Sequence, residues 1–234
     1  MNTEVFITGT GQGIGRALSE LLLSLGFRVT GISRNNSINH KNFCFLKYDL
    51  SEISNINKIE FIHTNAKKVV LINNAATIGT ISPFKEMKYS DIIYDYNLNL
   101  ISPVILTRKF LQTYTDTDKE LVVINISSGA ASKSIHSWST YCSSKSALEA
   151  FSEVLAVENY KNLKIFSFRP GIVDTKMQEK IRSSDASKFP IVNKFKAYFI
   201  ENKLLDTNYV AKKILYLIQN SKEFESKTHL VSEI

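Results

Sequence analysis

Cysteine and long apolar runs are scarce in this chain of 234 residues, and each scarcity excludes a class of protein. Two cysteines, Cys44 and Cys142, are too few for a disulfide framework, and they show no metal-ligand spacing with the four histidines. No apolar run reaches the roughly 18 residues of a membrane span, and the N-terminus lacks a basic segment followed by an apolar one. We therefore expect a cytoplasmic protein with reduced thiols, no metal and no membrane insertion.

Proline is also rare, with four in the chain, and no linker, internal repeat or low-complexity tract divides the sequence. A chain of this length with 44% hydrophobic and 22% charged residues can bury a substantial core. The sequence therefore predicts one domain over residues 1–234.

Acidic residues are fewer than basic ones, which gives a formal net charge of +7. A basic surface attracts phosphate, so nucleic-acid binding has to be weighed. The basic residues between Lys176 and Lys203 are interspersed with apolar ones, as on the solvated face of amphipathic helices, and no nucleic-acid motif accompanies them. We expect a solvated face and no nucleic-acid partner; a basic rim that steers anionic ligands is the alternative.

Short β-rich runs alternate with helical patterns along the whole chain. Most of the runs are apolar throughout, which is typical of strands covered on both faces. Between the first two, apolar residues recur at helical spacing from Ile14 to Leu25, and Gly26 follows, where a helix commonly stops. The alternation predicts an α/β Rossmann fold with a doubly wound parallel sheet of about seven strands. The expected strands cover residues 4–8, 28–33, 43–48, 69–73, 121–127, 163–170 and 228–231.

A glycine cluster lies between the first expected strand and the first helix. Gly9, Gly13 and Gly15 follow the spacing T-G-x-x-x-G-x-G from Thr8. Glycines there allow a tight turn and close approach to a pyrophosphate, whose charge the helix N-terminus favours. The alternative is a turn that only joins strand to helix. The predicted cofactor-binding residues of this loop are Gly9, Gly11, Gln12, Gly13, Ile14 and Gly15.

The end of the second strand bears on the choice of cofactor. An NAD site usually offers an acid here to bind the ribose hydroxyls, and none is present. Ser33 and Arg34 supply instead a hydroxyl and a guanidinium, which suits phosphate oxygens. We therefore favour NADP(H) over NAD(H), the alternative being that Arg34 is a solvated loop residue.

Three polar residues could form a catalytic group. Tyr141 and Lys145 are four apart on a predicted helix, so the phenol and the ammonium share a face. A neighbouring cation favours the phenolate, so we expect Lys145 to lower the Tyr141 pKa from its reference value near 10. Ser128, thirteen residues before Tyr141, ends the fifth strand, where its hydroxyl could bind a substrate carbonyl. A tyrosine and a lysine at this spacing are, taken alone, most often a surface pair.

Taken together and in order, these segments resemble the short-chain dehydrogenase/reductase family. The resemblance covers essentially the whole chain and implies a catalytic tetrad of Ser128, Tyr141, Lys145 and Asn99, with Asn97 as the competitor for the last place. Ala76 departs from the family's N-N-A-G pattern, and Gln12 stands where NADP-preferring relatives often carry a basic residue. The further cofactor-binding residues that the resemblance implies are Asp49, Leu50, Asn74, Ala75, Ala76, Tyr141, Lys145, Pro170, Gly171, Ile172 and Thr175.

The implied reaction is transfer of a hydride from NADPH to a small-molecule carbonyl while Tyr141 donates a proton. Residues 176–205 resemble the lid of benzil reductases and sepiapterin reductases, and Ser128, Trp138 and Met177 are the expected substrate contacts, with Phe189 as a further candidate. A benzil-type dicarbonyl ranks first; a pterin would need an acid such as Glu233. A noncatalytic dinucleotide sensor is the alternative from another class. By the same resemblance we expect a homodimer or homotetramer.

Overall fold

One parallel sheet forms the centre of the protein, which the computed structural model describes over residues 2–62 and 64–234. Its seven strands lie in the order β3-β2-β1-β4-β5-β6-β7. The predicted doubly wound sheet is confirmed, and each strand end lies within one residue of the expected one. The strands are β1 (Thr3–Thr8), β2 (Arg28–Ser33), β3 (Phe43–Lys47), β4 (Lys68–Asn73), β5 (Glu120–Ile126), β6 (Leu163–Arg169) and β7 (Thr228–Leu230).

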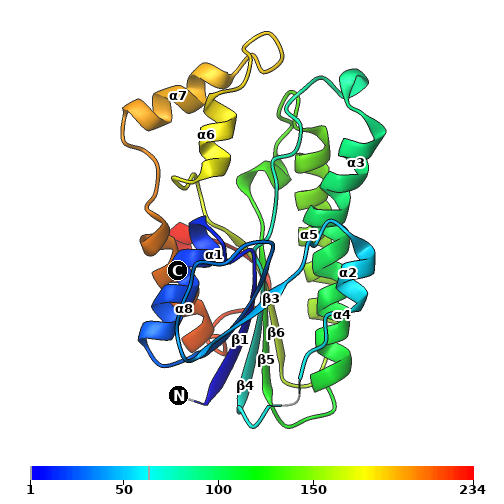
Figure 1. Cartoon of the computed structure of the whole chain (residues 1–234), viewed down its shortest axis with the longest axis vertical. Helices are drawn as coiled ribbons and strands as arrows, with labels where there is room; N and C mark the ends of the chain where they lie inside the picture. The colour runs from blue at the N-terminus through cyan, green and yellow to red at the C-terminus, as the bar shows by residue number, and fades with distance from the viewer. Residues whose placement is uncertain (1, 63) are drawn as a thin grey trace.

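Helices cover both faces of the sheet (Figure 1). α1 (Gly13–Ser24) and α8 (Thr207–Gln219) pack together on one face, while α2 (Ile53–Asn57), α4 (Ser102–Tyr114) and α5 (Ser139–Val157) lie on the other. Alternate residues of a strand therefore enter two separate cores: Val70 packs in the α1 and α8 layer, and Val69 in the opposite one. Because both faces are covered, the strands are apolar throughout rather than alternating.

The remaining helices lie at the carboxyl edge of the sheet. α6 (Lys176–Arg182) and α7 (Val192–Ile200) form the predicted lid segment and stand above the sheet on one side, and α3 (Tyr89–Tyr96) stands on the other (Figure 1). The strand order reverses between β1 and β4, and open α/β sheets bind ligands beside such a switch point. The short helical turns are η1 (Phe84–Glu86), η2 (Asn97–Ile101), η3 (Gly129–Ser132) and η4 (Val231–Glu233).

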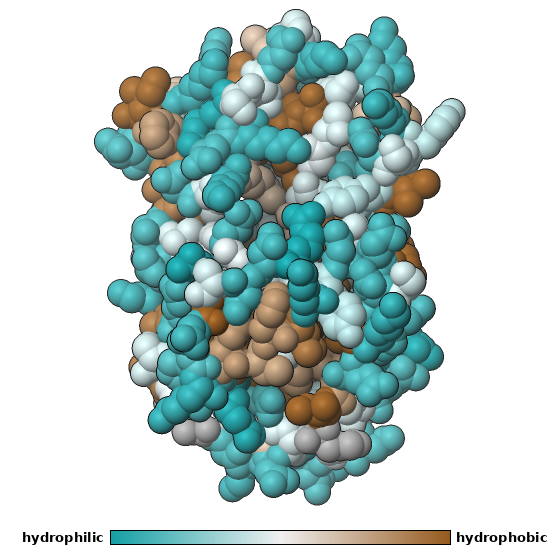
Figure 2. All heavy atoms as spheres, in the orientation of Figure 1, coloured by the Kyte–Doolittle hydropathy of each residue, from teal (hydrophilic) through white to brown (hydrophobic). Residues whose placement is uncertain are grey.

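Within the described ranges, no helix combines the length and the apolarity that crossing a bilayer takes. Figure 2 shows that hydrophilic side chains cover most of one face of the molecule.

Candidate active site

The glycine loop turns tightly where β1 meets α1. Gly9 and Gly13 have φ angles of +76° and +57°, a region that residues with a Cβ rarely adopt. A Cβ at Gly15 would lie 2.3 Å from the Gly9 carbonyl oxygen and 2.4 Å from Asn74 Nδ2. Asn74 Nδ2 in turn donates to the carbonyl oxygens of Thr8 (2.9 Å) and Gly9 (3.2 Å). Gly15 and Asn74 thus hold the shape of the loop.

The N-terminus of α1 is suited to an anion. No acidic residue lies in its first turn, and the side chain of Gln12 does not cap it. The first backbone N–H groups of the helix are therefore left to a ligand, and the helix dipole favours a negative one. A Cβ at Gly13 would lie 3.3 Å from Thr175 Cγ2, so the predicted residue Thr175 stands directly over this loop.

Arg34 and Asp49 lie at the rim beyond β2 and β3. Their nearest charged atoms are 3.9 Å apart, and Arg34 Nη1 also donates to the Tyr94 hydroxyl at 3.3 Å. Asp49 accepts from the backbone N–H and the hydroxyl of Ser51, as in a capped turn. With 61% of its side chain exposed, Arg34 is free to move toward a phosphate.

Ala76 occupies its place without strain. The family pattern has glycine here, but Ala76 is not among the described residues with a positive φ. The alanine at this position therefore does not require an altered turn. Asn74, Ala75 and Ala76 all line the cavity described below.

Tyr141 and Lys145 lie one turn apart on α5, and both side chains are buried, with relative exposures of 6% and 2%. Lys145 Nζ donates to the Ile126 carbonyl oxygen at 2.7 Å, which ties the helix to the end of β5. Ser128 follows that strand, caps η3 by accepting from the Ala130 N–H (3.1 Å), and lies near enough to the Tyr141 phenol to lower its pKa. The three predicted side chains therefore meet at the carboxyl edge of the sheet.

The expected effect of Lys145 on the phenol is wrong for the protein without cofactor. Burial raises the pKa of Tyr141 above its usual value, and the Ser128 hydroxyl opposes this only in part. Burial also lowers the pKa of Lys145 to about 8, against the attraction of the Glu149 carboxylate, which raises it. Desolvation outweighs the neighbouring charges because both groups lie in the interior.

Asn99 lies in η2, a single turn of π-helix, a distortion common at functional sites. Its side chain accepts from the Thr77 N–H (2.8 Å) and donates to the Thr77 carbonyl oxygen (2.9 Å). The amide is thus engaged with the loop after β4 and lies outside the cavity lining. The competitor Asn97 bonds elsewhere, to the Ser51 carbonyl oxygen.

One cavity of about 600 Å³, a size typical of ligand sites, joins the glycine loop to the three catalytic candidates. Of the residues predicted for the catalytic tetrad and for cofactor binding, only Gly15 and Asn99 lie outside its lining. The predicted residues that line it are Gly9, Gly11, Gln12, Gly13, Ile14, Ser33, Arg34, Asp49, Leu50, Asn74, Ala75, Ala76, Ser128, Trp138, Tyr141, Lys145, Pro170, Gly171, Ile172, Thr175 and Met177.

Aromatic side chains form the wall beyond Tyr141. The ring of Trp138 lies edge-on to Tyr141 at 5.6 Å, stacks on Phe189 at 5.4 Å and contacts Phe195 at 5.3 Å. Phe189 is fully buried behind Trp138 and does not line the cavity, so it supports the wall instead of contacting substrate. Glu233 accepts from the Leu230 N–H in η4 and also lies outside the lining, which removes the acid proposed for a pterin.

Comparison with known proteins decides the family. The model of the short chain dehydrogenase family matches residues 3–186. The chain belongs to this family. As a short chain dehydrogenase it is an oxidoreductase that uses a nicotinamide dinucleotide and acts on a small-molecule substrate.

The relatives of this short chain dehydrogenase include carbonyl reductases. A benzil reductase ((S)-benzoin forming) from Bacillus cereus is 34% identical over 235 residues, 93% of this chain and 94% of its own. A sepiapterin reductase from Xenopus tropicalis is 34% identical over 169 residues, 70% of this chain and 63% of its own. A solved short chain dehydrogenase/reductase from Saccharomyces cerevisiae is 26% identical, with a TM-score of 0.84 over 98% of this chain and 96% of its own.

The cavity of this short chain dehydrogenase also contains residues that the sequence analysis did not name. On α7 and just before it, Ile191, Lys194, Phe195 and Tyr198 line the lid side, and Lys133 follows η3 on the opposite side. The spacing i, i+3, i+4, i+7 of the first four is a signal for one helix face, and it was available in the sequence. Lys133 had no such signal, because only the fold brings it to this wall.

Proposed function

We propose that the protein is an NADPH-dependent reductase that converts a ketone or 1,2-dicarbonyl to the alcohol, with Tyr141 as proton donor. The observation that carries the proposal is the shared cavity: Ser128, Tyr141 and Lys145 line the same space as the glycine loop. A proton donor and a dinucleotide cradle in one cavity are what carbonyl reduction needs.

The residues present fit a dinucleotide phosphate. The glycine turns leave a surface without side chains, the uncapped N-terminus of α1 faces it, and Arg34 stands at the rim where an adenosine 2′-phosphate is expected. When bound, the nicotinamide supplies the hydride. Thr175 and Ile172 would hold its amide end, as the family resemblance implies, because both line the cavity on the lid side.

The chain's own side chains orient and protonate the substrate. Ser128 donates to the carbonyl oxygen and polarises it, and Tyr141 transfers its phenolic proton to that oxygen as negative charge develops. The raised pKa of Tyr141 keeps the phenol protonated at neutral pH, which is the form that a proton donor in reduction requires. Lys145, in its charged form, stabilises the resulting phenolate.

The substrate class rests on the lining and on the relatives together. Trp138, Met177 and Phe195 offer an apolar wall for a bulky or aromatic group, and a relative at 34% identity is named for benzil, an aromatic 1,2-diketone. Among the described lining residues, none on the lid side is an acid that could hold a pterin. We therefore place a benzil-type dicarbonyl ahead of a pterin.

Replacing the phenol tests the assignment. Tyr141→Phe is expected to bind NADPH with unchanged affinity and to lose turnover of benzil by roughly 10²–10⁴-fold, the usual contribution of a general acid. Fluorescence titration and steady-state kinetics measure the two quantities. Tyr209→Phe, at an exposed position on α8, is the matched control and should keep wild-type turnover.

Near-normal turnover by Tyr141→Phe would refute the role of the phenol. NADPH binding by the wild type without turnover on any carbonyl would instead favour a dinucleotide sensor. Salt-sensitive binding of DNA or RNA without affinity for NADPH would instead favour a nucleic-acid-binding protein.

A further inference from the structure

The substrate side of the cavity is positively charged. Lys133 and Lys194 line it, and no acidic residue of the described lining lies on that side. The one acid of the described lining is Asp49, at the opposite rim beside Arg34. A cleft with cations of one sign raises the local concentration of anionic ligands.

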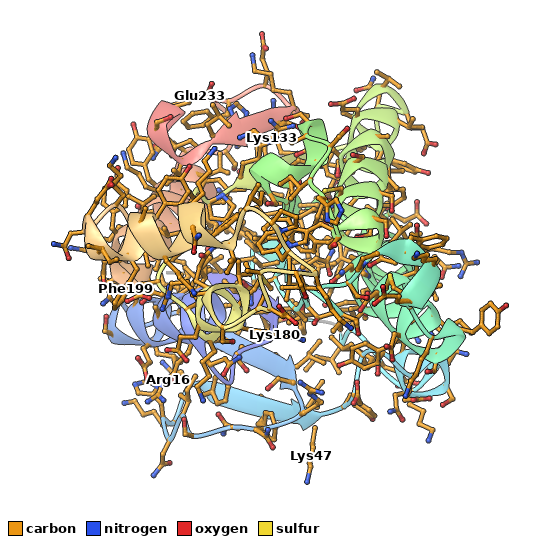
Figure 3. All side chains as sticks on the ribbon, turned by 90° about the horizontal axis from the view of Figure 1, so that it is seen from above. Arg16, Lys47, Lys133, Lys180, Phe199 and Glu233 are labelled. Carbon is orange, nitrogen blue, oxygen red and sulfur yellow. The ribbon has the colours of Figure 1, made fainter. Side chains whose placement is uncertain are left out.

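Lys176 and the other two lysines face different parts of the cavity. Lys176 follows Thr175, which stands over Gly13 of the phosphate-binding loop, so its charge belongs to the cofactor side. Lys133 ends η3, five residues after Ser128 and five before Trp138, and Lys194 lies on α7 beside Phe195. Figure 3, which looks down on the carboxyl ends of the strands, labels Lys133 beside η3. These two lysines therefore flank the space beyond Tyr141.

Neither lysine has an anionic partner among the described residues, whereas Lys188 and Lys203 of the same lid region pair with Glu86 and Glu201. Lys194 Nζ lies 6.0 Å from the centre of the Tyr198 ring, and that tyrosine lines the cavity too. The ring faces a cation but does not neutralise it. Two unpaired ammonium groups thus border an apolar wall that Trp138 and Phe195 form.

We propose that the substrate is anionic: an aryl or similarly apolar carbonyl compound that carries a carboxylate, held by Lys133 and Lys194. The inference rests on the proposed reductase function and specifies its substrate class. A hydride from NADPH adds to the keto carbon, Tyr141 gives a proton to the oxygen, and the products are the hydroxy acid and NADP⁺. The carboxylate takes no part in the reaction and serves only for binding.

Two acid and ester pairs test the charge preference. Phenylglyoxylate has its carboxylate next to the keto group and 4-carboxybenzil has it across a ring; each is compared with its methyl ester. In at least one pair we expect kcat/KM at low salt to favour the acid by tenfold or more, and the preference to shrink as NaCl rises. Esters reduced as well as the acids in both pairs would overturn the inference.

Substitutions assign the preference to the two lysines. Lys133→Met and Lys194→Met should each lower the acid-to-ester ratio about three- to tenfold, mainly through KM, and leave KM for NADPH unchanged. Lys196→Met, on the same helix but outside the lining, is the matched control. A raised KM for NADPH with an unchanged acid-to-ester ratio would show that these lysines serve the cofactor, and would also overturn the inference.

A binding measurement separates this inference from the proposed function. Trp138 is the only tryptophan of the sequence and lies in the cavity wall, so its fluorescence reports on ligands there. Mandelate should quench it at lower concentration than methyl mandelate in the protein loaded with NADP⁺, whether or not turnover occurs. Absence of reduction with all four carbonyls defeats the reductase proposal. Equal binding of mandelate and its ester, together with equal turnover of 4-carboxybenzil and its ester, defeats only the anionic substrate.

Discussion

Burial sets the protonation state of both Tyr141 and Lys145. Desolvation disfavours the charged form of each group, so it raises the pKa of the phenol and lowers that of the ammonium. The result is a proton held on Tyr141 and a lysine that titrates close to the working range. In the proposed reduction, the proton donor would thereby be kept in its acid form.

The lowered pKa of Lys145, about 8, predicts a pH limit. Below it the ammonium is charged and can stabilise a phenolate; above it the charge is lost. We expect kcat/KM for NADPH, which reports on the free enzyme, to fall about tenfold per pH unit above pH 8. Lys145→Arg keeps its charge throughout, so the residual activity of this variant should show no such fall. A wild-type profile that is flat to pH 10 would contradict the prediction.

We expect the choice between NADPH and NADH to depend on Arg34. A charged hydrogen bond contributes about 1.5–3 kcal/mol, and partial exposure places this contact toward the lower end. Arg34→Ala should therefore raise KM for NADPH roughly tenfold and change KM for NADH less than twofold.

Arg16 provides the control for that comparison. It lies on α1, pairs with Glu20 at 2.9 Å and is labelled in Figure 3. Arg16→Ala should change neither KM for NADPH nor KM for NADH. An equal rise in KM for NADPH and NADH in Arg34→Ala would mean that the Arg34 side chain does not contact the 2′-phosphate.

A row of polar residues on α3 and η2 holds the loop that follows β4. Asp91, Asp95 and Asn99 are spaced by four and so share one helix face. Asp91 accepts from the Thr80 hydroxyl (3.0 Å), Asn99 bonds the backbone of Thr77, and a Cβ at Gly79 would lie 2.0 Å from Asp95 Oδ2. Asp95 also accepts from the Thr140 hydroxyl at 2.8 Å, next to Tyr141. This element therefore links the cofactor side of the cavity to the start of α5.

Asp95 makes that link dependent on pH. Burial is the main cause that raises the pKa of its carboxyl above the usual value, while the Thr140 hydroxyl opposes the shift. The pKa of this carboxyl is near 4 in the unfolded chain and higher in the folded protein. The carboxyl therefore stabilises the fold fully when the pH is below the unfolded-state pKa. This contribution is lost as the pH rises through the folded-state pKa.

Asp95→Asn mimics the protonated carboxyl at every pH. Relative to wild type, its free energy of unfolding should be unchanged at pH 4 and higher at pH 7. Urea denaturation at both pH values measures the difference. Asp118→Asn, at a fully exposed position, should show no such gain. A larger loss of stability at pH 7 than at pH 4 would contradict the assignment.

At the scale of the whole molecule, α5 and η2 expose three large apolar side chains on their outer surface. Val154 and Val157 are 56% and 80% exposed, and Ile101 is 37% exposed. The family resemblance implies pairing through these helices, so the homodimer or homotetramer stays a prediction, which exposed apolar side chains here support.

Charge on that surface tests the assembly. We expect the wild type to sediment as a dimer or tetramer, and Val154→Arg to lower the measured mass because burying a guanidinium without a partner is costly. Ile200→Arg, at an exposed position on α7, should leave the mass unchanged. A wild type that sediments as a monomer would contradict the expected assembly.

The sequence by itself determined the sheet, the glycine turn and the one-turn spacing of Tyr141 and Lys145. These features depend on local periodicity and on residue type, and the strand ends agree with the structure to within one residue. Fold class and family follow from them.

The tertiary structure alone decided the chemistry around that framework. It put Phe189 behind Trp138, engaged the Asn99 amide with Thr77, reversed the expected shift of the Tyr141 pKa, and brought Lys133 and Lys194 to opposite sides of one cavity. The physical reason is that desolvation and cavity lining depend on segments distant in sequence that exclude water together, and no local pattern encodes that distance.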